Sequence, residues 1–540
     1  MEQVNTTPAS SAHEVEFPPP ISSHEAESPP PIDDQPERRK FMKRLQLDSE
    51  HSLEAQKDGF LELKKAPLFS LSVKEKSTVD TNARHLFPSY ALLGHILKDS
   101  SGRTVAHSDI DFVLLNTNHP WSAFLCGLQG SGKSHTMSCM LENCLYPSEE
   151  IGKLPQPLAG LVFNWDNQAG NICQAAYLST IGIEVNVFVS PSNYLTMRDK
   201  YHNEFGDCDN LKVLPYFLPA DLLNKERMVR LMAFEASAEN PPLYMQIIDK
   251  TIRTMAMETQ GSSKFKYDDG SRNCFKTRIL EEITNPQQSG PLNQRLDLLD
   301  SFLSGGAYER LFKRRAKYFP RADPETFLAG KPACLTVIDL TGTSDAETAC
   351  LLFDISLSVF LEKTNVPKVV ALDEAHNYLR GGAAATNFIQ ALEKTIREQR
   401  HKGTRVIVAT QEPSIGTEFL DLCDMTIAHR FTSPEWFKIL QNKVGGACKE
   451  AQMRRKKALA AVTNKDDNSN SMQLDEDPGL MSLLDEIMTL KVGESLLFSS
   501  TAMLDVKGDQ ITELGSAYVK LKTRTRISKD GGQSKTAIQK

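Results

Sequence analysis

The sequence predicts an α/β fold in which a mainly parallel sheet is covered by helices on both faces. A mostly helical insertion and a disordered N-terminal tail are expected beside it. Strands that are apolar throughout alternate with helical segments, as in parallel sheets that are buried on both faces. A long stretch at about 195–330 has helical periodicity and few strand signals. Residues 1–37 hold eight of the 28 prolines and cannot bury enough apolar surface to fold.

The N-terminal region, residues 1–85, is predicted to be an acidic, proline-rich tail and linker. Residues 1–37 contain eight acidic residues and no Lys or Arg. The 540-residue chain has a net charge of -7, so the rest of the chain carries a net charge of +1. The overall acidity therefore does not exclude a polyanionic partner. The tail is interpreted as a solvated segment or as an extended docking site for a protein partner.

The sheet and its helices are expected in two main parts, 86–195 and 331–464, and in a closing part, 479–540. Apolar runs predict strands at 90–97, 112–115, 123–126, 158–165, 185–189, 334–340, 368–372, 405–409, 425–429, 495–499 and 516–521. Helical patterns outside the insertion predict a helix that ends near Cys144 and helices at 347–361, 384–400 and 480–490. The insertion, 196–330, is expected to hold helices at 225–234, 243–257 and 292–302. Residues 465–478 are predicted to be a second acidic, disordered loop.

The strongest chemical signal is a glycine-rich turn that satisfies the pattern G-x-x-x-x-G-K-[ST] between an apolar strand and a helix. Its glycines let the backbone amides converge on phosphate oxygens, and the following helix adds its positive N-terminal end. The lysine of the pattern reaches the β- and γ-phosphates, and the hydroxyl after it ligates Mg²⁺. ATP and Mg²⁺ are therefore the expected cofactors. The predicted binding residues are Gly127, Leu128, Gln129, Gly130, Ser131, Gly132, Lys133, Ser134 and His135.

A second signal is an acidic pair, Asp373 and Glu374, directly after the apolar strand 368–372. In phosphate-loop ATPases this position carries the carboxylate of the Mg²⁺ shell, here Asp373. The adjacent Glu374 is predicted to activate the attacking water as a general base. A kinase would not need this glutamate, because the nucleophile of a kinase is its substrate. The pair therefore favours a hydrolase.

A third signal is the polar residue Gln411, which follows the apolar strand 405–409. If this strand lies next to the phosphate-loop strand, Gln411 is placed to sense the γ-phosphate. The alternative is an ordinary glutamine at the end of a strand.

The order of these motifs (GLQGSGKS, CLTVIDLTG, VVALDEAHNYL, IREQRHKGTRVIVATQEPS and IAHRF) resembles the HerA–FtsK superfamily of phosphate-loop ATPases. The resemblance covers about residues 90–520, with a gap at 195–330. It implies a RecA-like core, a hexameric ring and translocation of double-stranded DNA. It also implies catalytic roles for Lys133, Glu374 and Gln411.

The resemblance further implies an arginine that acts on the neighbouring subunit's nucleotide. Arg400 lies in the matching REQRHKG segment, and Arg397 is the second choice. A solvated cation near a helix C-terminus is the alternative for Arg400. One departure concerns the turn after strand 158–165, which reads Asn-Trp-Asp-Asn where relatives often carry Asp-Pro-His-Gly-Glu.

Contact with DNA is expected through basic clusters at 313–321, 454–457 and 520–529. Such clusters bind the phosphate backbone without reading the sequence, or they are solvated helix faces and strand edges. No helix-turn-helix or zinc-finger pattern is found in the sequence.

The ten cysteines form no Cys-x-x-Cys pair, which disfavours a structural zinc site or a disulfide framework. No long apolar run and no secretory signal are found, so neither a membrane contact nor secretion is expected. The chain is therefore expected to be intracellular. A basic run at 38–44 is a nuclear import signal or the start of a charged helix, which leaves nucleus or cytoplasm open.

Taken together, these features predict a motor-type ATPase that acts on DNA as a ring. A second hypothesis is an ATP-gated interaction protein that hydrolyses ATP slowly. Its binding surfaces would be the proline-rich tail and the helical insertion. A third hypothesis is a small-molecule or nucleotide kinase.

Overall fold

The N-terminal 60 residues and the acidic loop 465–477 lie outside the described residues of the computed structural model. Two of the basic clusters expected to contact DNA, 313–321 and 454–457, also lie outside them. The structure describes residues 61–79, 86–167, 171–232, 244–258, 266–268, 271–283, 285–303, 309, 328, 330–342, 345–362, 366–412, 414, 417–443, 478–508 and 510–531.

The described strands form one sheet whose central part is parallel throughout. In spatial order this part consists of β12 (Met425–Ala428), β4 (Ser122–Cys126), β11 (Thr404–Thr410), β10 (Lys368–Leu372), β6 (Ala159–Asn164), β9 (Cys334–Asp339), β7 (Glu184–Val189) and β8 (Leu211–Pro215). The carboxyl ends of these strands meet at one edge of the sheet, where parallel α/β sheets bind their ligands.

The sheet continues beyond β12 into a mostly antiparallel part. Its strands are β13 (Glu494–Phe498), β16 (Val519–Thr523), β2 (Tyr90–Lys98), β3 (Phe112–Asn116), β1 (Leu68–Ser70), β14 (Met503–Lys507) and β15 (Gln510–Glu513). A short strand, β5 (Gly152–Lys153), pairs with β2. The two ends of the described chain therefore fold together in this part of the sheet.

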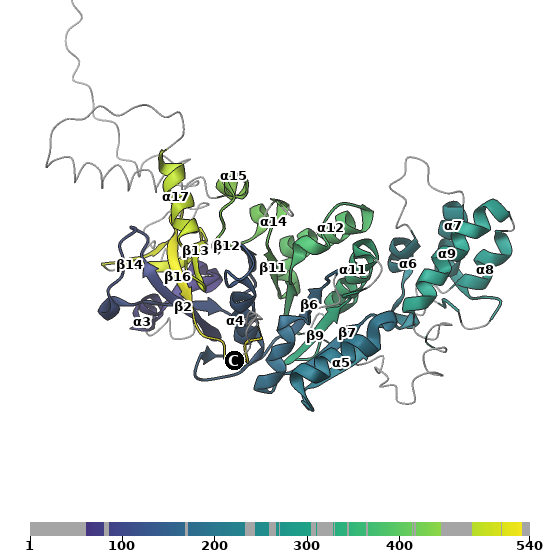
Figure 1. Ribbon diagram of the computed structural model, residues 1–540, viewed down its shortest axis with the longest axis horizontal. Helices are drawn as coiled ribbons and strands as arrows, with labels where there is room; N and C mark the ends of the chain where they lie inside the picture. The colour runs from purple at the N-terminus through teal and green to yellow at the C-terminus, as the bar shows by residue number, and fades with distance from the viewer. Residues whose placement is uncertain are drawn as a thin grey trace, which may run out of the picture. The chain divides into compact units, whose positions relative to one another are not determined.

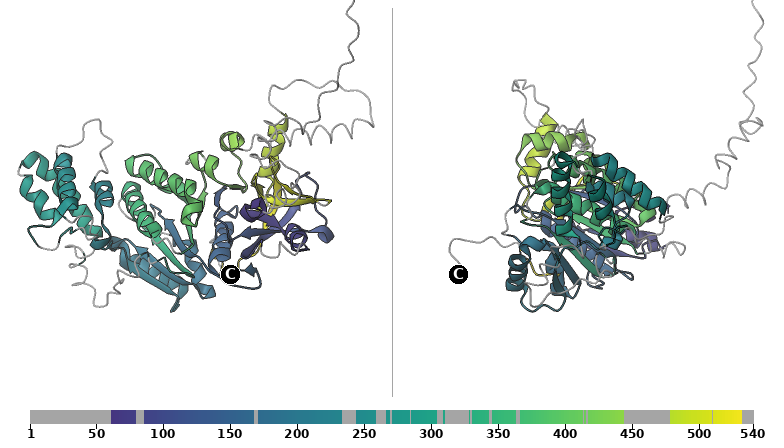
Figure 2. Two further views of the ribbon diagram at one scale, coloured as in Figure 1. Left: turned by 180° about the vertical axis from the view of Figure 1, so that it is seen from behind. Right: turned by 90° about the vertical axis from the view of Figure 1, so that its right-hand side faces the viewer.

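The central strands are mostly apolar because helices cover both faces of the sheet. In β10, Val369 and Ala371 join one apolar cluster, whereas Val370 and Leu372 join the other. The helices of one face are α11 (Ala346–Glu362), α12 (Ala383–Arg397) and α14 (Thr417–Leu422), and those of the other are α4 (Lys133–Leu145) and α5 (Tyr194–Phe205) (Figures 1 and 2). The predicted α/β fold with a mainly parallel, doubly covered sheet is thus confirmed.

The predicted insertion is largely helical, but it begins later than 196. The edge strand β8 and its neighbour α5 belong to the sheet and its cover. The helical part follows them as α6 (Lys225–Met232), α7 (Tyr244–Glu258), α8 (Phe275–Glu282) and α9 (Pro286–Phe302). Arg230 of α6 donates to both oxygens of Asp354 on α11 at 3.0 Å, which ties this part to the core.

The prediction of a disordered segment over 1–85 needs a correction for residues 61–79, which are folded. They include β1 and α3 (Leu71–Val79), and the rings of Phe69 and Phe87 stack at 3.8 Å. Apolar side chains such as Phe69 hold these short elements in a small core of their own. Three further described helices are α13 (Gln399–Lys402), α15 (Pro434–Lys443) and α17 (Pro478–Met488). None of the helices in the described ranges is long and apolar enough to cross a bilayer.

Candidate active site

The glycine-rich turn follows β4 directly and leads into α4, as the sequence predicts. Gly127, Gly130 and Gly132 all have positive φ values, of 149°, 73° and 112°. These left-handed conformations are strained for residues with a Cβ atom, which explains the glycines. The amides of Gly130 and Gly132 donate no hydrogen bond to any part of the chain that the structure describes. They remain available to phosphate oxygens at the N-terminus of the helix.

The phosphate loop is held by backbone hydrogen bonds on two sides. The amide of Leu128 donates to the Arg430 carbonyl at 2.9 Å, and the amide of Gly493 donates to the Ser131 carbonyl at 3.2 Å. His429 is fully buried beneath the loop, and a Cβ atom on Gly127 would approach its Cβ to 2.7 Å. Burial and the nearby charge of Lys133 lower the pKa of His429 to about 3, so its ring is neutral.

Lys133 and Asp373 lie close together beneath the loop. The Lys133 ammonium is buried and donates to the carbonyl of Leu128 at 3.1 Å. Burial lowers the pKa of Lys133, while the charges of Glu374 and Asp373 oppose that shift. Burial, followed by repulsion from Glu374, raises the pKa of Asp373 to about 7, against the opposing effect of Lys133. The structure thus brings the predicted lysine and both predicted carboxylates into one electrostatic group.

Gln411 and Glu374 are in direct contact. Because β11 pairs with both β4 and β10, Gln411 lies between the phosphate loop and the acidic pair. Its side-chain amide donates to both carboxylate oxygens of Glu374, at 3.1 and 3.0 Å. Glu374 itself has φ 47° and ψ 44°, a left-handed backbone that costs about 1 kcal/mol for a residue with a Cβ atom. Strain of this kind is concentrated at functional sites.

His376 is a neighbour that the sequence interpretation did not assign. Its Nδ1 accepts a long hydrogen bond from the amide of Gln411 at 3.4 Å and lies 3.4 Å from a carboxylate oxygen of Glu374. Burial lowers the pKa of His376, against the opposing charge of Glu374. Its place two residues after an acidic pair was the signal that could have identified it.

The oxygen atoms at this edge fit Mg²⁺, which prefers hard oxygen ligands and keeps several waters. The Ser134 hydroxyl, in the first turn of α4, makes no hydrogen bond within the described ranges. Asp373 accepts at Oδ1 from the amide of Glu374 at 3.1 Å, and its Oδ2 has no partner among the described residues. Hydroxyl and carboxylate are therefore both free to coordinate an ion. In the described ranges no group of three or more His, Cys, Asp or Glu side chains could hold a metal by itself, so phosphate oxygens would have to complete the shell.

Arg400 is not part of this group of residues. It lies in α13, just before β11, whereas Gln411 follows the same strand. The seven residues of β11 separate the two by about 20 Å, at roughly 3.3 Å per residue. Arg400 is exposed. Arg397, also exposed, pairs with Glu393 at 3.0 Å. The predicted role of either arginine at a neighbouring subunit's site remains a prediction.

A second buried carboxylate, Asp339, lies at the same edge and was missed as a site residue. Asp339 ends β9, and it accepts hydrogen bonds from Asn164 at 3.0 Å and from the hydroxyl of Tyr201 at 2.7 Å. Burial raises the pKa of Asp339 despite these bonds. Asn164 ends β6 and begins the Asn-Trp-Asp-Asn turn, residues 164–167. The structure shows that this turn serves a buried polar network beside the acidic pair.

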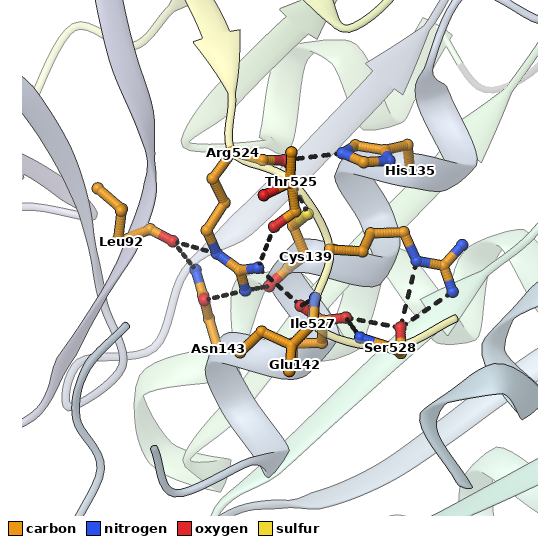
Figure 3. A network of polar contacts seen from close by, with 10 residues as sticks. Leu92, His135, Cys139, Glu142, Asn143, Arg524, Thr525, Ile527 and Ser528 are labelled. Carbon is orange, nitrogen blue, oxygen red and sulfur yellow. Dashed lines mark hydrogen bonds and ion pairs between the residues drawn. The ribbon is translucent and has the colours of Figure 1, made fainter. Parts of the chain in front are cut away.

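A C-terminal segment after β16 covers the outer side of the phosphate-loop helix α4 (Figure 3). Arg524 pairs with the fully buried Glu142 of α4 at 2.7 Å and donates to the side chain of Asn143 at 2.9 Å. The hydroxyl of Ser528 donates to Glu142 at 2.6 Å. His135 directs its Nε2 to the Arg524 carbonyl at 2.8 Å. Its role in binding the cofactor stays a prediction. We call residues 524–528 the C-terminal strap.

Comparisons with known proteins find similarity only among solved structures, since no family model and no curated protein matches the chain. VirB4 of Thermoanaerobacter pseudethanolicus shares 12% identity over 80% of this chain and 96% of its own, with a TM-score of 0.43. The plasmid coupling protein TrwB in complex with ADP and Mg²⁺ shares 12% identity over 80% of this chain and 98% of its own, with a TM-score of 0.34. A bacterial conjugative coupling protein, TrwB in an unbound form, has a TM-score of 0.35. These similarities leave the function to be argued from the site itself.

Proposed function

We propose that this chain binds ATP with Mg²⁺ and hydrolyses it. The observation that carries the proposal is the contact of Gln411 with Glu374 at the carboxyl edge of the sheet, beside Asp373 and Lys133. A carboxylate held by an amide, next to a lysine and a phosphate loop, is suited to activating a water molecule for attack on a γ-phosphate.

Each residue has a defined task in this proposal. The free amides of the loop and the N-terminus of α4 bind the phosphate oxygens, and Lys133 adds its charge. Ser134 and Asp373 would hold Mg²⁺, which would neutralise charge at the phosphates. Glu374 takes the proton of the attacking water, and Gln411 orients the Glu374 carboxylate for this transfer.

We further propose that the hydrolysis drives a ring-shaped motor on double-stranded DNA. Support comes from the order of the sequence motifs and from the exposure of Arg400 at the edge of the sheet opposite to the chain's own site. An arginine in that place is free to complete the site of a neighbouring copy, where it would stabilise the charge that develops on the transferred phosphoryl group. Because Arg400 would act on the site of a neighbouring copy, the proposal includes self-association of the chain.

The decisive experiment measures ATP turnover with and without double-stranded DNA at low and moderate salt, together with light scattering on a sizing column. Lys133→Ala is the control that removes nucleotide binding. Turnover that depends on Lys133 supports the ATPase. Stimulation by DNA that weakens with salt, and a mass of several subunits with ATP, support the motor. Turnover without any DNA effect at low salt would leave an ATPase and reject the motor on DNA.

A further inference from the structure

The turn between α17 and β13, residues 491–494, lies directly beside the phosphate loop. Besides donating to the Ser131 carbonyl, Gly493 leaves so little space that a Cβ atom on Gly132 would lie 3.0 Å from its amide nitrogen. We call these four residues the Val492 turn. Because β13 is antiparallel to β12, the turn stands at the carboxyl edge of the parallel strands, where the candidate active site lies.

Hydrogen bonds fix the Val492 turn from several directions. The turn is closed by the amide of Glu494, which donates to the Lys491 carbonyl at 2.9 Å, and Gly493 has a φ of 76°. From β16, the Lys522 ammonium donates to the Val492 carbonyl at 2.7 Å, and the amide of Thr523 donates to the Gly493 carbonyl at 3.1 Å. The backbone of the turn is thus held rigidly against the phosphate loop.

The side chain of Val492 nevertheless faces solvent, with 61% of its surface exposed. This aliphatic side chain stands on a backbone that is fixed directly beside the loop that would bind a ligand. Val492 has no polar group in its side chain, and its carbonyl is already occupied by Lys522. Any contact that this side chain makes with a ligand is therefore apolar.

The order of the strands in the sheet indicates whether the phosphates or the nucleoside of a bound nucleotide would reach this turn. Gln411 and Glu374, which would face the γ-phosphate, follow β11 and β10 on one side of the phosphate-loop strand β4. The Val492 turn precedes β13, two strands from β4 on the other side, which corresponds to about 10 Å. A triphosphate whose γ-phosphate points toward Glu374 therefore directs its nucleoside toward Val492.

We propose that Val492 is the apolar platform for the base of the nucleoside triphosphate, an inference that rests on the proposed function. The platform recognises the flat face of the base and not its hydrogen-bonding edge. Adenine and guanine nucleotides are therefore held alike at this contact, whereas inorganic triphosphate does not use it.

The test measures the affinities of ATP, GTP and inorganic tripolyphosphate by calorimetry with Mg²⁺, in a Glu374→Gln background that prevents turnover. Val492→Ser is expected to weaken ATP and GTP about fivefold each and to leave tripolyphosphate unchanged. Val492→Phe, which enlarges the platform, is expected to strengthen both nucleotides. The matched control is Leu195→Ser, since Leu195 is 56% exposed on α5 and follows β7, on the far side of β10 from the phosphate loop.

The outcomes separate the platform from the proposed function. A wild-type protein that binds ATP and tripolyphosphate, with a Val492→Ser variant that binds ATP equally well, overturns the platform alone. Equal weakening of ATP and tripolyphosphate also overturns it, because the substitution would then act through the phosphate loop. A wild-type protein that binds neither ligand rejects the proposed function and the platform with it.

Discussion

Gln411 donates its side-chain amide to both carboxylate oxygens of Glu374, although 37 residues separate the two along the chain. The contact arises because parallel strands β10 and β11 are hydrogen-bonded neighbours and each residue follows its own strand. It fixes the orientation of a carboxylate whose backbone is already held in a strained conformation. This pair is the basis of the first two predictions.

Gln411→Ala is expected to lower the kcat of ATP hydrolysis about 100-fold with little change in KM, because Glu374 loses its orientation and the phosphate loop is untouched. Steady-state kinetics measures both constants. The matched control is Gln399→Ala, which removes an amide that donates to Asp424 at 2.9 Å at the opposite end of β11. Similar losses of kcat in both variants would show that Gln411 acts through the fold and not on the site.

Glu374→Gln is expected to keep ATP binding and to lower turnover by more than about 100-fold, because an amide cannot accept the proton of the water. Filter binding with labelled ATP and a phosphate-release assay measure the two effects. Lys133→Ala, by contrast, is expected to lose the binding itself. Unchanged phosphoryl transfer in Glu374→Gln would favour the kinase hypothesis, since a kinase does not activate water.

Arg400→Ala is expected to bind ATP and to be inactive by itself. Mixed with Glu374→Gln it is expected to regain activity, because an interface can then combine an intact Glu374 with an intact Arg400 from the neighbouring subunit. A titration of one inactive variant against the other, followed by phosphate release, measures this complementation. Arg397→Ala serves as the control and is expected to stay active, since Arg397 pairs with Glu393. Mixtures that remain as inactive as their components would remove Arg400 from the mechanism.

The stability of the fold is expected to fall in mild acid through His429. Its folded pKa of about 3 lies below the ordinary value of 6.5, so only the unfolded chain binds a proton between these values. Above pH 6.5 the His429 ring is neutral in both the folded and the unfolded chain, and the protein keeps its full stability. Below pH 6.5 the free energy of unfolding falls by about 1.4 kcal/mol for each pH unit, down to about pH 3. Urea unfolding at pH 7 and pH 5 measures the loss. His429→Gln should show a smaller difference between the two pH values, and an identical difference would contradict the assignment.

Arg524→Ala is expected to destabilise the protein by about 3–5 kcal/mol, because it leaves the buried carboxylate of Glu142 without its charged partner. The double variant Glu142→Ala, Arg524→Ala is expected to be less destabilised than the sum of the single variants. Thermal or urea unfolding measures this cycle. The surface pair of Arg103 and Asp99, at 3.3 Å with the arginine 83% exposed, is the control and should contribute less than about 1 kcal/mol. Additive effects at Glu142 and Arg524 would mean that the strap does not depend on their contact.

The carboxyl group of Glu142 also illustrates how the strap depends on charge. Burial alone would raise its pKa, but hydrogen bonds from Ser528 and the charge of Arg524 outweigh burial and lower it. The carboxylate therefore stays ionised at neutral pH and stabilises the strap until the pH falls through this lowered value.

Seven of the eight strands of the parallel core could be predicted from the sequence, because each is a short, mostly apolar run whose side chains are buried on both faces of the sheet. The strands β14 and β15 were not predicted, nor was β8. In β15, Gln510–Glu513, the two middle residues are partly buried and the two end residues are exposed, so no apolar run marks this edge strand. The folded segment 61–79 was likewise missed, because its sequence has little periodicity and part of its core comes from residues distant in sequence, such as Leu114 and Met503.

The sequence by itself determined the phosphate loop and the acidic pair, because each is a local unit in which a strand, a turn and its polar residues follow one another along the chain. The tertiary structure alone decided which residues join them. Gly493 reaches the carbonyl of Ser131 across more than 350 residues, and Arg524 reaches Glu142 across 382 residues. No local pattern encodes such pairs, since they depend on the order of strands in the sheet, and that order is set by packing of the whole chain.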